Sequence, residues 1–189
     1  EKGHLSVPRL ASIVEQIAHL HQQGRQMDLI TSGAVAFGRK KLRDEVKKSI
    51  SIRETMAETP VSQQFSENRA SAAIGQSGLM SFYESLFHQY DCKVAQVLVT
   101  KDDFQFEASR RQLRTTIMDL LRLNIVPIVN TNDVVEATVT KNMTNRVLDL
   151  KQADMNEIIL EDNDSLAAIL SAELESDLMI MLSDVDGIY

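Results

Sequence analysis

The feature that most constrains the fold is a run of apolar residues at 125–129, Ile-Val-Pro-Ile-Val. A half-exposed strand alternates apolar and polar residues, whereas this run is apolar at every position. Such a run is typical of a central strand in a parallel sheet that is buried on both faces. The chain is therefore expected to build an α/β fold around this strand.

Apolar runs and amphipathic stretches alternate along the chain. Apolar residues with helical spacing predict a helix over 10–20, with Pro8 in its first turn and Gly24 at its end. The predicted strands are 27–31, 93–100, 125–129, 157–160, which is short, and 178–182. The predicted helices between them are one that holds Val35, Phe37 and Leu42, one at 66–90, a long one from Asp102 and one at 162–175. The long helix is expected to turn Leu113, Ile117, Leu120 and Leu121 inward. This alternation predicts a parallel sheet with helices on both faces.

Two polar segments interrupt the pattern. Residues 43–64 are interpreted as a solvated helix or as an excursion that ends at Pro60, and residues 137–157 as a long excursion over a site. Gly75 and Gly78 predict close helix packing. His19 and His21 are expected on the polar side of the first helix.

Composition excludes several classes of function. The net charge of −7 argues against a nucleic-acid partner held through phosphate contacts. The single cysteine, Cys92, allows no internal disulfide and is interpreted as a small buried apolar residue. No membrane span is predicted. The histidines lack metal-ligand spacing, so no metal site is assigned, and neither a P-loop nor a dinucleotide-binding glycine motif is present.

Polar residues follow each predicted strand, where an open parallel sheet binds its ligands. Residues 31–34, Thr-Ser-Gly-Ala, could offer backbone N–H groups to a carboxylate or phosphate, although, taken alone, this segment is better explained by Ser32 acting as an N-cap. At 130–133, Asn-Thr-Asn-Asp, the choice between a site and an Asx turn stays open. Asp133 could accept hydrogen bonds from an ammonium group.

Two further polar clusters occupy 161–165 and 183–187. The first cluster contains more possible N-cap residues than one helix needs. The second cluster, taken alone, is only a weak indication of a ligand site. Together the four clusters describe a cleft of donors, carboxylates and helix N-termini. Phosphoryl transfer relies on such positioning and charge stabilisation.

Several of these segments resemble the glutamate 5-kinase family of amino-acid kinases. They are residues 31–38, 72–80, 124–133, 162–168 and 182–189. The resemblance covers nearly the whole chain in order. In detail it is closest to the kinase half of animal delta-1-pyrroline-5-carboxylate synthases, which are two-domain mitochondrial enzymes of proline and ornithine synthesis.

The resemblance implies a three-layer α/β/α sandwich with a mainly parallel sheet, and phosphoryl transfer from ATP with Mg²⁺ to the γ-carboxylate of L-glutamate. It implies that Asp133 meets the glutamate ammonium group and that Asp164 orients the family's catalytic lysines. The remaining implied contacts are Ser32, Gly33, Ala34 and Asn163 with glutamate, and Ser183 and Asp184 with ATP.

The chain also departs from the family pattern. Residues 1–189 read as one kinase domain that lacks the family's first strand with its phosphate loop and the downstream nucleotide-binding part. Lys2, Lys40 and Lys41 are not assigned to the family's lysine roles. The chain alone is therefore expected to be incomplete for catalysis, while the intact protein is expected to be active.

Alternative interpretations remain. Another amino-acid kinase would act on acetylglutamate, aspartate or UMP, and a non-catalytic effector-binding or assembly module would keep only the fold. The resemblance implies feedback inhibition by ornithine or proline at the glutamate site, a homo-oligomer, and a mitochondrial location, with a cytoplasmic one as the alternative. Residues 137–157 are expected to act as a lid over that site.

Overall fold

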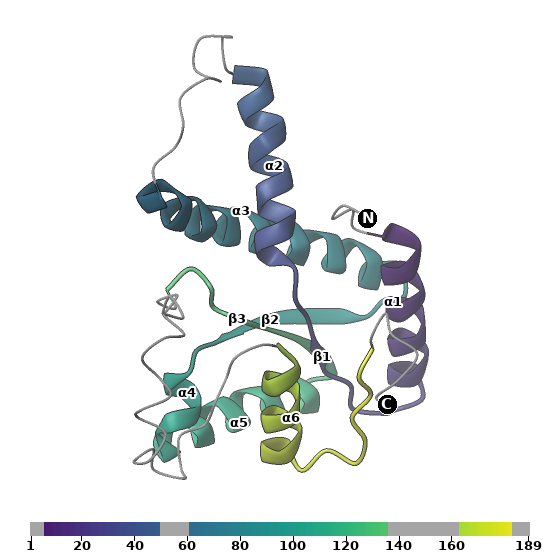
Figure 1. Ribbon diagram of the computed structural model, residues 1–189. Coiled ribbons are helices and arrows are strands. Elements are labelled where there is room, and N and C mark those ends of the chain that lie inside the picture. The colour runs from purple at the N-terminus through teal and green to yellow at the C-terminus, as the bar shows by residue number, and fades with distance from the viewer. Residues whose placement is uncertain (1–5, 50–60, 136–162, 183–189) are drawn as a thin grey trace, which may run out of the picture.

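The computed structural model describes residues 6–49, 61–135 and 163–182, and in them helices cover both faces of a parallel sheet (Figure 1). The strand order is β1 (Leu29–Ile30), β3 (Ile125–Thr131), β2 (Lys93–Val99). Leu29 pairs with Ile128, and Lys93 pairs with Ile125, both in parallel. The predicted central parallel strand is thus confirmed, and the predicted first strand is shorter than expected.

One helical layer contains α1 (Val7–Gln22), α2 (Ala34–Ser49) and α3 (Val61–His88). Val126 and Ile128 of β3 are buried in one apolar cluster with α1 and α3. Cys92 belongs to this cluster, as its predicted apolar role requires, and burial raises the pKa of its thiol. In Figure 1, α2 and α3 lie above the sheet and α1 stands at its right-hand side.

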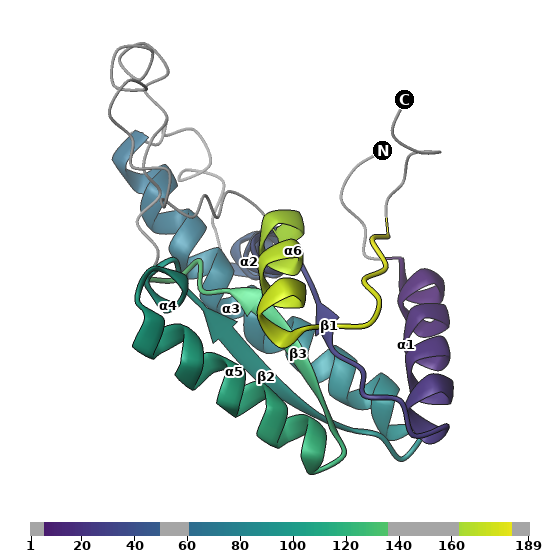
Figure 2. The same ribbon diagram turned by 90° about the horizontal axis from the view of Figure 1, so that it is seen from below.

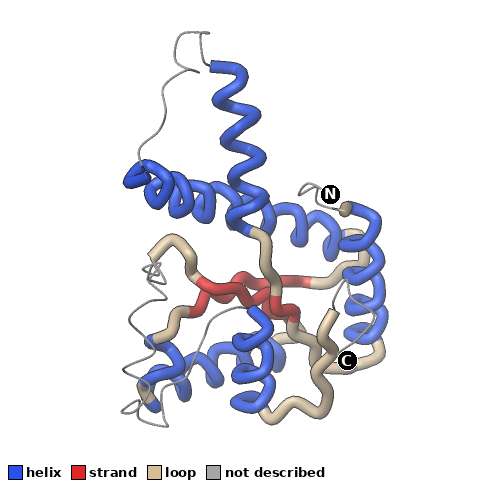
Figure 3. Tube along the Cα trace, viewed as in Figure 1, coloured by secondary structure: helices blue, strands red, loops and turns tan. Residues whose placement is uncertain are grey.

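The opposite layer contains α4 (Asp102–Gln105), α5 (Glu107–Arg122) and α6 (Asn163–Leu174). Val129, the next residue of β3 after Ile128, points to this side and packs in a second cluster with Ile117, Leu166 and Leu170. Successive side chains of a strand point to opposite faces, so β3 supplies both cores. The view from below and the coloured trace show the same three layers (Figures 2 and 3).

The predicted long helix after β2 is broken in two. Phe106, between α4 and α5, has an extended backbone with φ −99° and ψ 127°, and its side chain is 61% exposed. The Asp103 carboxylate accepts hydrogen bonds from the Thr100 N–H at 2.7 Å and from its hydroxyl at 2.9 Å. These two hydrogen bonds, both accepted by Asp103 Oδ2, hold the turn that leads from β2 into the short helix α4.

The prediction for His21 is wrong, because its side chain is only 7% exposed. His21 follows Val14, Ile17 and Ala18 at helical spacings of seven, four and three residues. It therefore continues the buried stripe of α1, whereas His19 is exposed as expected.

The predicted strand at 178–182 is also wrong in the described structure. These five apolar residues adopt no regular secondary structure, and the exposed fraction of their side chains ranges from 43% to 75%. An apolar run forms a strand only where a neighbouring strand supplies hydrogen-bonding partners. In contrast, the predicted helices at 66–90 and 162–175 are confirmed by α3 and α6.

Residues 43–49 continue α2, so the first part of the polar segment is helical, and α3 begins earlier than predicted, at Val61. The predicted excursion at 137–157 and short strand at 157–160 lie outside the described residues.

Helices α2 and α3 cross with their backbones in contact. A Cβ atom added to Gly75 would lie 1.7 Å from the Ala34 carbonyl oxygen, and one added to Gly38 would lie 1.8 Å from that of Ser71. Only glycine allows this approach. The predicted close packing at Gly75 is confirmed, and Gly78 makes room for the Phe37 ring in the same way.

Candidate functional site

The ends of the three strands meet at one edge of the sheet. The Thr31 N–H donates to the Val129 carbonyl oxygen at 2.9 Å, and the Asn132 N–H donates to that of Val99 at 2.8 Å. Parallel strands place their carboxyl ends together, so the polar segments after β1 and β3 are neighbours. This is the edge where the sequence predicted a site.

Gly33 shapes the turn between β1 and α2. Its φ of +98° lies in the region that favours glycine, and no atom lies within 4 Å of an added Cβ, so the requirement is conformational. The Gly33 carbonyl oxygen accepts the first helical hydrogen bond, from Phe37 N–H at 2.9 Å. Gly33 thus occupies the N-cap, and the interpretation of Ser32 as the cap is wrong.

The free N–H groups in the first turn of α2 can meet an anion. A helix leaves its first N–H groups without internal partners, and they favour negative charge. Ser32 is exposed beside them, while Ala34 is 3% exposed and packs under α3. Ser32 and Gly33 are thus accessible to a carboxylate.

The segment after β3 is held by side-chain hydrogen bonds. Asn130 is 1% exposed and donates from Nδ2 to Gln76 Oε1 at 2.8 Å, while its Oδ1 accepts from the Thr131 N–H at 2.9 Å. The Thr131 hydroxyl donates to Asp133 Oδ1 at 2.8 Å. These bonds leave Asp133 partly exposed with one carboxylate oxygen free of this contact.

The N-terminus of α6 approaches the same strands. Leu166, one turn into this helix, packs with Val129 and the partly buried Ile30. Asn163 lies on the same face as Leu166, three residues earlier, and Asp164 is exposed. Asn163 is thus half-buried at the start of α6, whereas Asp164 is exposed to solvent, and their predicted roles toward glutamate and the lysines stay predictions.

Two buried oxygen atoms in these segments have no hydrogen-bond partner among the described residues. They are Thr31 Oγ1 and Asn163 Oδ1. Buried polar atoms are nearly always paired, so such orphans call for an explanation. A polar ligand at the edge would supply the missing partners.

Sequence reasoning missed Thr31 and Gln76 as individual contributors. The sequence did contain a signal for Gln76, because Gln76 lies at helical spacing from the apolar residues Ala72, Leu79 and Met80. All four side chains are buried on the same stripe of α3. A glutamine among buried apolar residues needs a polar partner. The partner could not be read from the sequence because Asn130 lies on another element.

Ser183 and Asp184, the predicted ATP contacts, lie outside the described residues. Among residues 6–49, 61–135 and 163–182, no group of three or more histidine, cysteine or acidic side chains could hold a metal ion. Nor does any described helix have the length and hydrophobicity needed to cross a membrane.

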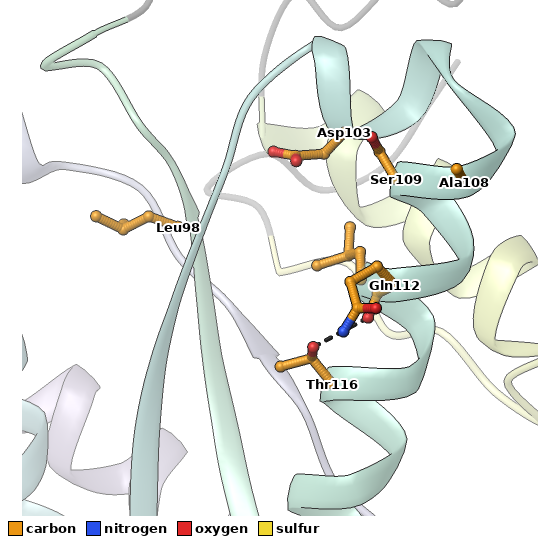
Figure 4. Close-up of a pocket in the computed structure, with 7 residues that line it drawn as sticks. Leu98, Asp103, Ala108, Ser109, Gln112 and Thr116 are labelled. Atoms are coloured by element: carbon orange, nitrogen blue, oxygen red, sulfur yellow. Dashed lines mark hydrogen bonds between the residues drawn. The ribbon is translucent and has the colours of Figure 1, made fainter.

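A separate cavity of about 430 Å³ lies between α5 and the outer edge of β2 (Figure 4). Leu98, Leu113 and Ala108 line it together with Ser109, Gln112 and Thr116. The charged group there, Asp103, is engaged by Thr100. No cationic side chain is among the described residues that line this cavity, so it lacks a charge that could hold a phosphate.

Comparison with known proteins places the chain in a family. The model of the amino acid kinase family matches residues 2–189. The chain belongs to the amino acid kinase family. An α/β sheet with helices on both faces and polar strand ends agrees with this amino acid kinase assignment.

Two kinds of relative resemble this amino acid kinase chain along almost its full length. Delta-1-pyrroline-5-carboxylate synthase of Mesembryanthemum crystallinum is 41% identical over 189 residues, which is 99% of the chain and 24% of the relative. Glutamate 5-kinase of Symbiobacterium thermophilum is 39% identical over 188 residues, or 59% of its length. Glutamate 5-kinase of a Thermoanaerobacter species is 35% identical over 189 residues, or 42% of its length.

The chain spans about a quarter of the length of the plant relatives. The resemblance to glutamate 5-kinases predicted from the sequence is confirmed at the level of the family and its relatives. What those longer proteins do as a whole enters the next subsection as a proposal.

Proposed function

We propose that the protein containing this chain transfers the γ-phosphoryl group of ATP to the γ-carboxylate of L-glutamate. The observation that carries the proposal is the polar edge of the sheet, where Asp133 follows β3 and where Thr31 Oγ1 and Asn163 Oδ1 are buried without hydrogen-bond partners among the described residues. Relatives named glutamate 5-kinase and delta-1-pyrroline-5-carboxylate synthase, at 35–41% identity, support this substrate.

The two segments at the edge suit the two ends of an amino acid. The partly exposed Asp133 carboxylate would accept hydrogen bonds from the α-ammonium group, and Asn163 Oδ1 would accept another. The N–H groups that follow Ser32 and Gly33 would hold a substrate carboxylate at the N-terminus of α2. These contacts would hold glutamate in one orientation at the edge.

In the proposed reaction, a γ-carboxylate oxygen of glutamate attacks the γ-phosphorus of ATP. The new P–O bond forms as the bond to the β-phosphate oxygen breaks, giving glutamyl 5-phosphate and ADP. Positioning of the two reactants supplies much of the acceleration. Asp164 would orient the lysines that the family uses, and Ser183 and Asp184 would contact the nucleotide.

Mg²⁺ fits this site as a companion of ATP. The described edge offers single carboxylates at Asp133 and Asp164, and Mg²⁺ is commonly held by phosphates with few protein ligands. The ion would neutralise charge on the phosphates. No described residue is assigned as its ligand.

The wider setting belongs to the same proposal. We propose a role in proline and ornithine synthesis within a two-domain enzyme, feedback control by ornithine or proline at the glutamate site, a homo-oligomer and a mitochondrial location. The names of the plant relatives support the two-domain setting. The lid role of residues 137–157 remains a prediction.

The test is an assay of the full-length protein with ATP and glutamate, in which glutamyl phosphate is trapped with hydroxylamine. Asp133→Ala removes the proposed ammonium contact and is expected to lower kcat/KM for glutamate by roughly 100-fold or more, as loss of a charged contact does. Asp102→Ala, at an exposed acidic position on α4, is the matched control. Retained activity in Asp133→Ala would remove Asp133 from the site. No activity on glutamate in the wild type would refute the proposed reaction.

A further inference from the structure

A buried amide pair joins α3 to the substrate edge. Gln76 and Asn130 are 8% and 1% exposed, and they are joined by the 2.8 Å hydrogen bond from Asn130 Nδ2 to Gln76 Oε1. The direction of this bond follows from the neighbouring one. Asn130 Oδ1 already accepts from the Thr131 N–H, so its Nδ2 group is left to donate.

The hydrogen bonds continue from this pair to the carboxylate of Asp133. Asn130 Oδ1 holds the backbone of Thr131, and the Thr131 hydroxyl holds Asp133 Oδ1 at 2.8 Å. Gln76 itself is buried and is separated from Asp133 by these two residues. Any influence of Gln76 on a ligand at Asp133 is therefore exerted through Asn130 and Thr131.

The residue before Gln76 contacts the other half of the edge. The backbone of Gly75 lies directly against the Ala34 carbonyl oxygen, where even one methyl group would clash. Consecutive residues of one helix thus touch the turn after β1 and the segment after β3. A rigid helix that contacts both segments holds them at a constant separation.

We propose that Gln76 is a positioning residue, which holds Asp133 at the distance from the Gly33–Ala34 turn that an amino-acid substrate requires. The inference rests on the proposed function, because that function assigns the ammonium group to Asp133 and a carboxylate to the turn. Loss of the pair would displace Asp133 and weaken glutamate binding while the nucleotide site is untouched.

The test compares four variants of the full-length protein, three with a single substitution and one with two. Gln76→Met keeps the volume but removes the acceptor, and is expected to raise KM for glutamate roughly tenfold or more with KM for ATP unchanged, since small misplacements are costly. Gln76→Glu keeps an acceptor oxygen and is expected to restore most of the affinity. Asn130→Ala, alone and combined with Gln76→Met, is expected to give non-additive effects on KM for glutamate.

Leu79→Ala is the control for simple loss of stability. Leu79 is 2% exposed on the same helix but belongs to the apolar cluster with α1. Its truncation should lower Tm without changing KM for glutamate. If Gln76→Met lowers Tm in the same way and leaves KM for glutamate unchanged, the positioning role is refuted.

Amide hydrogen exchange separates this proposal from the proposed reaction. In Gln76→Met, amides in residues 130–133 are expected to exchange faster than in Leu79→Ala at matched overall stability. If the wild type does not phosphorylate glutamate, the reaction fails, and this exchange decides the positioning role. Unchanged protection of residues 130–133 would overturn it.

Discussion

At the scale of single residues, Asp28 is a carboxyl group whose surroundings disfavour its charge. It lies just before β1, at the end of the strand opposite the candidate site. Burial raises the pKa of Asp28 above its ordinary value, opposed by a weaker hydrogen bond from its own backbone. Asp28 is half-buried and has no cationic partner among the described residues, so the neutral form of its carboxyl group is favoured in the folded state.

This pKa shift predicts a pH-dependent effect of Asp28→Asn. The folded pKa is raised, so the protonated form adds stability below the ordinary carboxyl pKa, and this stability is lost as pH rises through the folded pKa. At pH 7 the substitution is expected to raise Tm by roughly 2–4 °C, which is the shift that a gain of about 1 kcal/mol in the free energy of unfolding produces in a protein of this length. Thermal melts at several pH values provide the measurement, and the gain should vanish below about pH 4. A gain that persists in acid would contradict the explanation.

At the scale of elements, the crossing of α2 and α3 is a contact between two backbones that supports the site. It places the Gly75 backbone on the Ala34 carbonyl oxygen, so the helix that carries Gln76 cannot move relative to the turn after β1. Cores tolerate added volume poorly where the neighbour is backbone.

Gly75→Ala is therefore expected to destabilise the protein by about 3 kcal/mol, measured by urea unfolding. Gly24→Ala is the control, because Gly24 has φ +84° but no atom within 4 Å of an added Cβ. Only backbone strain applies there, at about 1 kcal/mol. Equal effects of the two substitutions would mean that the helices separate at little cost.

The elements show what the sequence could predict and what it could not. Ile125–Thr131 was recognisable as a central strand because its apolar run reports burial on both faces. The break was missed because Phe106 adopts an extended backbone between α4 and α5, which the apolar spacing of the segment does not reveal. Likewise His21 was misplaced because burial follows the α1 stripe rather than side-chain polarity.

The candidate site was predictable to a similar extent. The strand-end rule located the segments that hold Ser32 and Asp133, since carboxyl ends of parallel strands coincide. It is not tested for Asn163, because the strand predicted before it lies outside the described residues. The Gln76–Asn130 pair depends on how α3 lies over β3, which local pattern does not encode. The N-cap was assigned to Ser32 instead of Gly33 because a positive φ cannot be seen in a hydroxyl-rich turn.

At the scale of the whole molecule, residues 178–182 form an exposed apolar stretch. Leu178, Ile180 and Leu182 are 75%, 68% and 66% exposed. Contiguous exposed apolar surface promotes association between molecules. This tendency to associate is a property of the whole molecule in solution rather than of one site.

The isolated chain is accordingly expected to associate as its concentration rises. Light scattering should report a mean mass that increases with concentration. The double substitution Leu178→Lys, Ile180→Lys should reduce this increase by roughly half or more, because charge opposes burial of this stretch. Val7→Lys, at an exposed position on α1, is the control. Scattering that is unchanged by the double substitution would place the association elsewhere.

The strand order has a consequence for how the chain is made. Among the described strands, β1 and β2 pair only with β3, which the ribosome synthesises after both of them. Until residues 125–131 emerge, neither earlier strand has a neighbour, and the apolar side of α1 and α3 has no sheet to cover. Long-range parallel pairing is slow, so this interval favours capture by chaperones. A nascent chain that stalls before residues 125–131 have emerged from the ribosome is a more vulnerable species than one that stalls just after they have emerged.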